Sequence, residues 1–266
     1  MWLGAQAPAS PTLATVPFTS RLMAAREPFD IILPAGYGTG ARRYAVLYLL
    51  HGLGGHYGTW MKNTKDMTDD APHPLIIVMP EGGDGFFIDG SQPHTQWASY
   101  ILDELIPYID AHYRTEANRQ GRAVAGVSMG GYGALRFGVQ HPELFSFAAG
   151  LSAALAAQLS DSFIGKACPS CDAIVRTDFG PTGSSLRTAN ELQSLLAAAP
   201  RAQLPFLFVS CGTEDPLLQV NRAFSRLLDR DHIPHENIEQ PGAHSWTLWK
   251  QQLPGVLRLL AARWRL

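Results

Sequence analysis

Short runs of consecutive apolar residues recur along the chain and predict buried strands. The clearest runs cover residues 44–50 and 74–79. Runs of this length without alternating polar positions are typical of strands that are covered on both faces of a parallel sheet. Shorter apolar segments at residues 122–127, 145–151 and 205–210 predict three further strands. Residues 15–20 and 28–33 are expected to form an extended, hairpin-type start.

Apolar residues at helical spacing separate these strands. From Tyr100 to Tyr113 they recur every three or four positions, which predicts a helix that Pro107 should kink. A second helix is expected from residue 128 or 129 to about residue 140, where His141-Pro142 ends it. Residues 217–230 and 245–263 fit amphipathic helices. This alternation predicts an α/β fold: a mostly parallel central sheet with helices on both faces.

Composition narrows the class of protein. The chain has 266 residues, of which 46% are apolar, and its 21 basic and 23 acidic residues give a net charge of −2. The apolar content argues against disorder, and the lack of basic excess argues against a nucleic-acid partner. No apolar stretch is long enough for a membrane span. We expect a single domain over residues 1–266, with residues 1–13 as a loosely ordered lead-in. We interpret this lead-in as something other than an intact signal peptide, and a trimmed leader, the compartment and the oligomeric state stay open.

The three cysteines do not form a disulfide scaffold. Cys168 and Cys171 form a C-x-x-C pair in a loop-like stretch, where inert thiols and a local disulfide are both open interpretations. A zinc site would need two more ligands nearby, and none is found in the sequence. We therefore expect neither a metal ion nor a cofactor.

Chemistry enters with the segment Gly126-Val-Ser128-Met129-Gly130, which matches the G-x-S-x-G motif. In this motif a sharp turn between a strand and a helix exposes one serine above the sheet. The string alone is weak, but an apolar strand precedes it and a glycine-containing helical pattern follows. The alternative interpretation of Ser128 is a helix N-cap. We interpret Ser128 as a nucleophile.

A serine nucleophile needs a base and a carboxylate that orients the base. Asp215 follows the strand predicted at residues 205–210 and is the expected acid, with Glu214 in reserve. Because Asp215 precedes Pro216, the alternative interpretation of it is a cap of the next helix. His244 lies in a glycine-containing loop before the last helix and is the expected base. The other downstream histidines, His232 and His235, lie in a polar turn and are interpreted as solvated.

The loop after the first buried strand, residues 51–55, is rich in glycine and is the expected source of an oxyanion donor. We expect the donors to be the backbone amides of Leu53 and Met129. His51 precedes the serine in the chain and is expected to fix this loop through hydrogen bonds. Residues at the strand ends are candidates for the walls of a substrate pocket, namely Gly52, Trp60, Phe86, Phe87, Trp97 and Trp246. Residues 152–204 are the only candidate cap, and no large lid is expected.

These motifs together resemble the putative esterase family of α/β-hydrolases, which includes S-formylglutathione hydrolases, feruloyl and acetylxylan esterases and mycolyltransferases. The resemblance covers residues 14–262. It implies an α/β-hydrolase fold, a triad of Ser128, Asp215 and His244, and oxyanion donors at Leu53 and Met129. The motifs that carry it are Leu49-Leu-His-Gly52 with Trp60, Glu104-Leu-Ile-Pro-Tyr108 with His112-Tyr-Arg114, residues 126–134, His141-Pro with Phe145, and residues 211–215 with 242–246.

The resemblance also ranks the functions. S-formylglutathione hydrolases typically carry histidine where this chain has Val127 and Tyr132. The resemblance therefore favours a serine carboxylesterase for short acyl or hydroxycinnamoyl esters, either small or attached to a polysaccharide. Alternatives are acyl transfer to a sugar or another alcohol, an S-formylglutathione-type thioesterase and, least favoured because every triad member is present, a non-catalytic binding protein.

Overall fold

The computed structural model describes residues 10–64, 74–156 and 171–265. Its centre is an eight-stranded sheet in the order β1-β4-β6-β5-β7-β8-β9-β10. The six strands from β6 to β10 in this order run parallel, and β4 and β1 join antiparallel at one edge. The strands in chain order are β1 (Thr12–Val16), β4 (Phe29–Leu33), β5 (Ala45–Leu50), β6 (Leu75–Met79), β7 (Arg122–Val127), β8 (Phe147–Leu151), β9 (Phe206–Gly212) and β10 (His235–Gln240). A separate hairpin pairs β2 (Thr19–Ser20) with β3 (Ala25–Arg26).

Two apolar layers cover the sheet, because successive side chains of a strand point to opposite faces. In β5, Val46 and Tyr48 belong to one buried cluster, and Leu47 and Leu49 belong to the other. Every residue of β5, β6, β7 and β8 is buried. The uninterrupted apolar runs of the sequence follow from this double burial.

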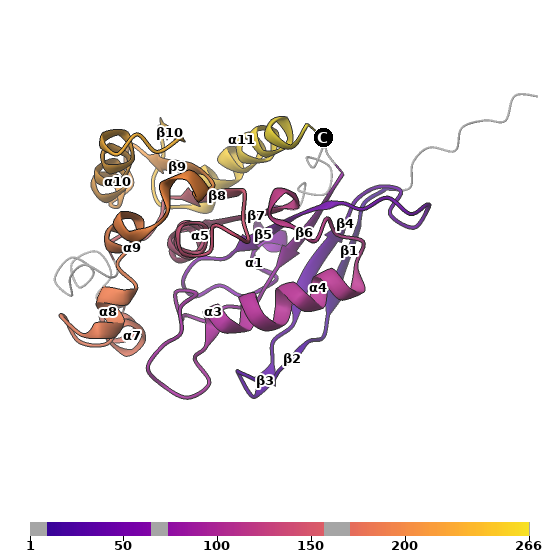
Figure 1. Ribbon diagram of the computed structural model, residues 1–266, viewed down its shortest axis with the longest axis horizontal. Coiled ribbons are helices and arrows are strands. Elements are labelled where there is room, and N and C mark those ends of the chain that lie inside the picture. Colours follow the sequence, from indigo (N-terminus) through magenta and orange to yellow (C-terminus); the bar gives the residue numbers. More distant parts are fainter. Residues whose placement is uncertain (1–9, 65–73, 157–170, 266) are drawn as a thin grey trace, which may run out of the picture.

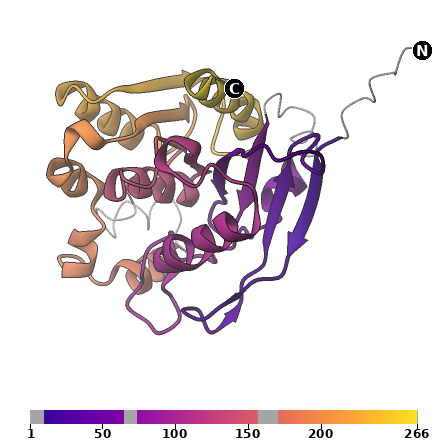
Figure 2. The same cartoon turned by 45° about the vertical axis from the view of Figure 1, so that its right-hand side comes forward.

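Helices lie on both faces of the sheet (Figures 1 and 2). One face carries a group that includes the long helices α5 and α10, and the other carries α1 and α11. In the described residues, no helix is long and apolar enough to cross a membrane. The first group comprises α3 (Trp97–Ser99), the π-helical η1 (Tyr100–Leu105), α4 (Ile106–His112), α5 (Met129–Gln140), α7 (Cys171–Phe179), α9 (Leu192–Ala198) and α10 (Leu218–Arg230); the second comprises α1 (Thr59–Asn63) and α11 (Trp246–Trp264). The short helices η2 (Arg119–Gly121), α8 (Ser185–Ala189) and η3 (Arg201–Gln203) complete the described elements.

The predicted α/β fold class, with a mostly parallel sheet and helices on both faces, is confirmed. The expected first strand is placed differently, because β1 begins at Thr12, inside the segment expected to be a loose lead-in. Residues 1–9 of that segment lie outside the described residues. β1 pairs with β4 in the expected antiparallel sense.

Pro107 lies in the first turn of α4, directly after the π-helical segment η1. Proline has no backbone N–H. It is tolerated in the first turn of a helix, because the N–H groups of that turn have no partner within the helix. Where the kink is expected, the helix changes from the π-helical type to the α type directly before the proline.

The described part of the candidate cap, residues 152–156 and 171–204, contains the short helices α7, α8 and α9. Cys171, at the start of α7, is disulfide-bonded, which decides against a free thiol at this position. Cys168 lies outside the described residues. Cys211 is free and buried in β9.

Candidate active site

The turn between β7 and α5 holds Ser128 in a strained conformation, with φ +53° and ψ −115°. Such a backbone is rare for a residue with a side chain and persists only where the surroundings enforce it. Here they do: a Cβ on Gly126 would lie 2.4 Å from the Gly130 carbonyl, and one on Gly130 would lie 2.4 Å from the His51 carbonyl oxygen. The two glycines therefore let three backbone segments meet directly beneath the serine.

His244 connects Ser128 to Asp215 through its two ring nitrogens. Its Nε2 is 2.9 Å from Ser128 Oγ, and its Nδ1 is 2.8 Å from Asp215 Oδ2. An ionised carboxylate can only accept, so Nδ1–H donates to Asp215, and in the neutral imidazole Nε2 accepts the serine hydroxyl. The structure thus brings together the three side chains expected as nucleophile, base and acid, from the ends of β7, β9 and β10.

The Asp215 side chain is fully buried, which by itself raises its pKa. The hydrogen bond and charge of His244 and the hydrogen bond from the Leu217 amide, 2.8 Å from Asp215 Oδ1, outweigh burial and lower this pKa. The carboxylate therefore stays charged and keeps the imidazole in the required orientation. Glu214 beside it is exposed and accepts a hydrogen bond from the Thr213 hydroxyl. In the part of the chain that the structure describes, no hydrogen bond or ion pair joins Glu214 to His244.

The two expected oxyanion donors lie beside the serine. Met129 is the first residue of α5, so its amide has no partner within the helix. Among the described residues, the Leu53 amide makes no hydrogen bond. The expectation that His51 fixes this loop is confirmed, because His51 Nδ1 lies 2.8 Å from the Gly52 carbonyl oxygen and donates to it.

A pocket of about 540 Å³ opens over the serine. Its polar groups include the Ser128 and His244 side chains and the glycine-rich loop, and its walls are largely apolar. Pockets of this size bind small organic ligands. The residues that line it include Gly52, Leu53, Phe86, Ser128, Met129, Ala154, Cys171, Leu217, His244, Trp246 and Trp249.

Three of the aromatic residues expected in the pocket wall are placed elsewhere. Trp60 is fully buried, donates through Nε1 to the Leu50 carbonyl and packs edge-on under Trp246, because α1 turns it toward the sheet. Phe87 is also fully buried. Trp97 lines a second cavity of about 330 Å³. Sequence reasoning missed Trp249, which packs edge-on against His244 with the ring centres 4.9 Å apart. Its spacing of three from Trp246, on one helix face, was the available signal.

A second serine–histidine pair lies away from this pocket. Ser225 Oγ is 3.1 Å from Nε2 of His235, whose Nδ1 donates to the Ile233 carbonyl. The His235 side chain is only 10% exposed, so the interpretation of this histidine as solvated is wrong. His232 is exposed. Because Ser225 and His235 do not line the pocket, the Ser225–His235 pair provides a matched control for the Ser128 site.

Comparisons with known proteins agree with the geometry. The sequence model of the family described as "Putative esterase" matches residues 20–260. An acetyl esterase of Caldicellulosiruptor saccharolyticus is 26% identical over 81% of this chain and 83% of its own length. A ferulic acid esterase structure has a TM-score of 0.80, at 24% identity over 96% of this chain and 99% of its own, which shows the α/β-hydrolase fold.

Relatives with other names also align over most of the chain. An esterase of Mycobacterium tuberculosis is 28% identical over 87% of this chain, which spans only 56% of that protein. A diacylglycerol acyltransferase/mycolyltransferase of Mycobacterium leprae is 27% identical over 82% of this chain and 75% of its own length.

Proposed function

The chain belongs to the putative esterase family of carboxylic ester hydrolases, and from this premise we propose that it is a serine esterase for short-chain acyl or hydroxycinnamoyl esters. The observation that carries this proposal is the hydrogen-bonded line of Ser128, His244 and Asp215 at the floor of an apolar pocket. These three side chains supply the nucleophile, the base and the orienting acid that acyl transfer through a covalent intermediate needs.

The reaction follows from the hydrogen bonds. Ser128 Oγ attacks the ester carbonyl while His244 Nε2 accepts its proton, and Asp215 stabilises the imidazolium that forms. The Leu53 and Met129 amides donate to the oxyanion. The imidazolium then protonates the leaving alcohol, and an acyl-enzyme remains on Ser128. His244 next removes a proton from water, which hydrolyses the acyl-enzyme and frees the acid.

The substrate class rests on the pocket. Phe86, Leu217, Trp246 and Trp249 offer an apolar lining, and its volume of about 540 Å³ suits a short or aromatic acyl group. The acetyl esterase and ferulic acid esterase names among the similar proteins agree with this class.

The test is a hydrolysis panel of p-nitrophenyl acetate, butyrate and octanoate, methyl ferulate and a glutathione thioester. Ser128→Ala is expected to lower kcat by about 10³-fold or more. The control is Ser225→Ala, which also removes a serine bonded to a histidine and is expected to stay within about twofold, because it lies outside the pocket. An inactive wild type, or a Ser128→Ala variant as active as wild type, would contradict the proposal.

A second candidate is acyl transfer, favoured by the similarity to a protein named an acyltransferase. The same residues would serve, with an alcohol in place of water at the deacylation step. Glycerol or glucose added to the p-nitrophenyl butyrate reaction tests this candidate. New ester product at the expense of free butyrate supports transfer, and unchanged butyrate release rejects it.

A further inference from the structure

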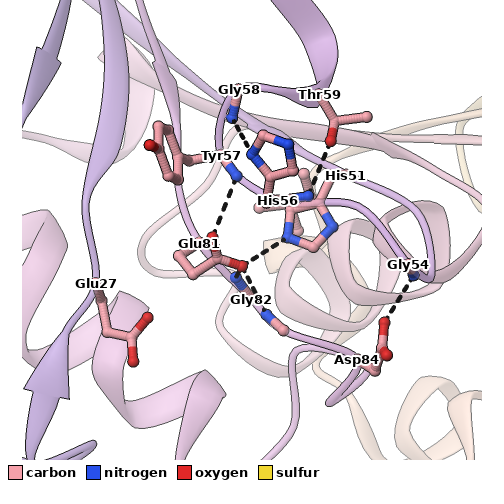
Figure 3. A network of polar contacts seen from close by, with 12 residues as sticks. Glu27, His51, Gly54, His56, Tyr57, Gly58, Thr59, Glu81, Gly82 and Asp84 are labelled. Carbon is pink, nitrogen blue, oxygen red and sulfur yellow. Dashed lines mark hydrogen bonds and ion pairs between the residues drawn. The ribbon is translucent and has the colours of Figure 1, made fainter.

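The loop that follows β6 lies against the loop that carries Leu53, and two of its carboxylates contact that loop (Figure 3). Asp84 Oδ1 accepts a hydrogen bond from the Gly54 amide at 2.7 Å. Glu81 Oε1 lies 3.6 Å from His51 Nε2, and Glu81 Oε2 accepts a longer hydrogen bond, 3.4 Å, from the Tyr57 amide. Two side chains from one strand end thus bind the other loop at several points.

These contacts lie on both sides of Leu53. On one side, His51 donates through Nδ1 to the Gly52 carbonyl, and its Nε2 faces Glu81 at 3.6 Å, beyond hydrogen-bond distance. Both oxygens only accept, so both contacts are favourable together when both ring nitrogens carry a hydrogen. On the other side, Asp84 holds the amide of Gly54, which has φ +71° and no atoms near the place of a Cβ. Packing therefore does not fix this glycine, and a charge-assisted hydrogen bond does. Between these contacts the Gly55 amide donates to the Gly52 carbonyl at 3.0 Å and closes the turn that contains Leu53. The direction of the Leu53 amide follows from this turn and from the two flanking peptide units that the side chains hold.

The surroundings of Glu81 favour its ionised form. Burial raises its pKa, but the contact with His51 and the hydrogen bonds from the Gly82 and Gly83 amides outweigh burial and lower the pKa to about 2. Glu27 behaves in the opposite way, because burial and the charge of Glu81 raise its pKa to about 7. In Figure 3 Glu27 stands apart with no contact to the loop, which makes it a natural control.

We propose that Glu81 and Asp84 are positioning residues for ester hydrolysis, which hold the Leu53 amide where the oxyanion forms. We call this pair the carboxylate clamp. The proposal rests on the proposed function, because it assigns a role within that reaction. Neither carboxylate lines the pocket over Ser128, so the clamp acts through His51 and the backbone of residues 52–57.

Kinetics provide the first test. Loss of an oxyanion donor lowers kcat by about 10²–10³-fold, and a donor that is displaced rather than removed should cost less, about 10–100-fold. We expect this loss for Asp84→Ala, with KM within about threefold, because the oxyanion contact is made in the transition state. Asp84→Asn keeps an acceptor oxygen and is expected to recover most of the rate. Glu81→Gln is expected to lower kcat by about tenfold, because it removes the charge that faces His51.

A boronic acid inhibitor separates positioning from general damage, because its tetrahedral adduct on Ser128 presents an anionic oxygen to the same amides. The Kd of the inhibitor should rise in Asp84→Ala by about the same factor by which kcat falls. The control Glu27→Gln removes a buried carboxyl near Glu81 without touching the loop, and we expect its kcat and inhibitor Kd to stay within about twofold. Equal losses in Glu27→Gln and Asp84→Ala would overturn the proposal, since the effect would then be structural.

Hydrogen exchange by mass spectrometry tests the clamp without turnover. Peptides that cover residues 51–58 should exchange faster in Asp84→Ala and Glu81→Gln than in wild type, and Glu27→Gln should match wild type. Unchanged exchange in both clamp variants would overturn the proposal, and so would faster exchange with an unchanged kcat. If wild type hydrolyses no ester, the proposed function fails instead, and the exchange rates still show whether the two carboxylates hold the loop.

Discussion

The two proposed oxyanion donors are held in different ways. Met129 follows a turn fixed by backbone packing, in which Gly126 meets Gly130 and Gly130 meets the His51 carbonyl. Leu53 lies in a turn that one backbone hydrogen bond closes, from Gly55 to Gly52, and that side chains hold on both flanks, through Asp84 on one and His51 on the other. A turn held by packed backbone is disrupted by added side-chain volume. A loop held by carboxylates is disrupted by a change of charge or by the loss of a single hydrogen bond. We therefore expect the serine turn to respond to an added methyl group at Gly126, and the Leu53 loop to respond to a changed carboxylate at Asp84.

The largest effect on kcat is expected for Asp215→Asn. Its comparison with Asp84→Asn tests whether the carboxylates of the two regions have different roles. Asp215 orients the base and stabilises its protonated form directly, so the amide should lower kcat by about 10³–10⁴-fold. Asp84→Asn keeps its acceptor for the Gly54 amide and should lose less than about tenfold. Parallel kcat measurements on p-nitrophenyl butyrate compare the two replacements. Similar losses of kcat in both variants would contradict the proposal that Asp215 acts on the base and Asp84 acts on the Leu53 loop.

The next effect concerns volume. In Gly126→Ala the new Cβ would lie 2.4 Å from backbone atoms of Gly130, so the turn must open, and we expect a loss of about 3 kcal/mol in the free energy of unfolding. The matched control in the other loop is Gly52→Ala, whose Cβ would meet only ordinary contacts at 3.5 Å or more, with an expected loss below about 1 kcal/mol. Urea unfolding followed by tryptophan fluorescence measures both. Equal losses would mean that the two loops are packed alike.

The difference between the two regions also explains what the sequence could predict. The turn around Ser128 is encoded locally, because its glycines, its strand and its helix are contiguous in the chain. Asp215 and His244 could be found because each follows the carboxyl end of a strand. The carboxyl ends of parallel strands lie along one edge of the sheet, where catalytic groups gather. Asp84 reaches Gly54 from 30 residues away, and no local pattern marks a contact of that kind.

The aromatic residues show the same limit. Trp60 and Trp249 are both near the site, but the first is fully buried under Trp246 and the second lines the pocket. Which of them meets the substrate depends on how α1 and α11 are rotated against the sheet. That rotation is set by the packing of the whole apolar layer, and not by the spacing of the tryptophans alone.

The smallest effect concerns a third carboxyl, Asp178 of α7, which lines the second cavity together with Asp84. Asp178 is 7% exposed, and among the described residues its Oδ2 has no hydrogen-bond partner. Burial, and then the charge of Asp84, raise its pKa to about 7. An unfolded aspartate has a pKa near ~3.9, so between these two values the folded state binds more protons, and the free energy of unfolding falls as the pH rises.

Asp178→Asn removes this cost, because an amide carries no charge to bury or to repel Asp84. We expect the variant to be more stable than wild type by about 1–2 kcal/mol at pH 8, a value reduced because the cavity is open to solvent, and equal to wild type at pH 4. Urea unfolding at both pH values measures the difference. A variant less stable than wild type at pH 8 would show that ionised Asp178 has a favourable partner. Because Asp84 keeps its bond to Gly54 in this variant, kcat should stay within about twofold, so the charge beside the clamp is separable from the clamp itself.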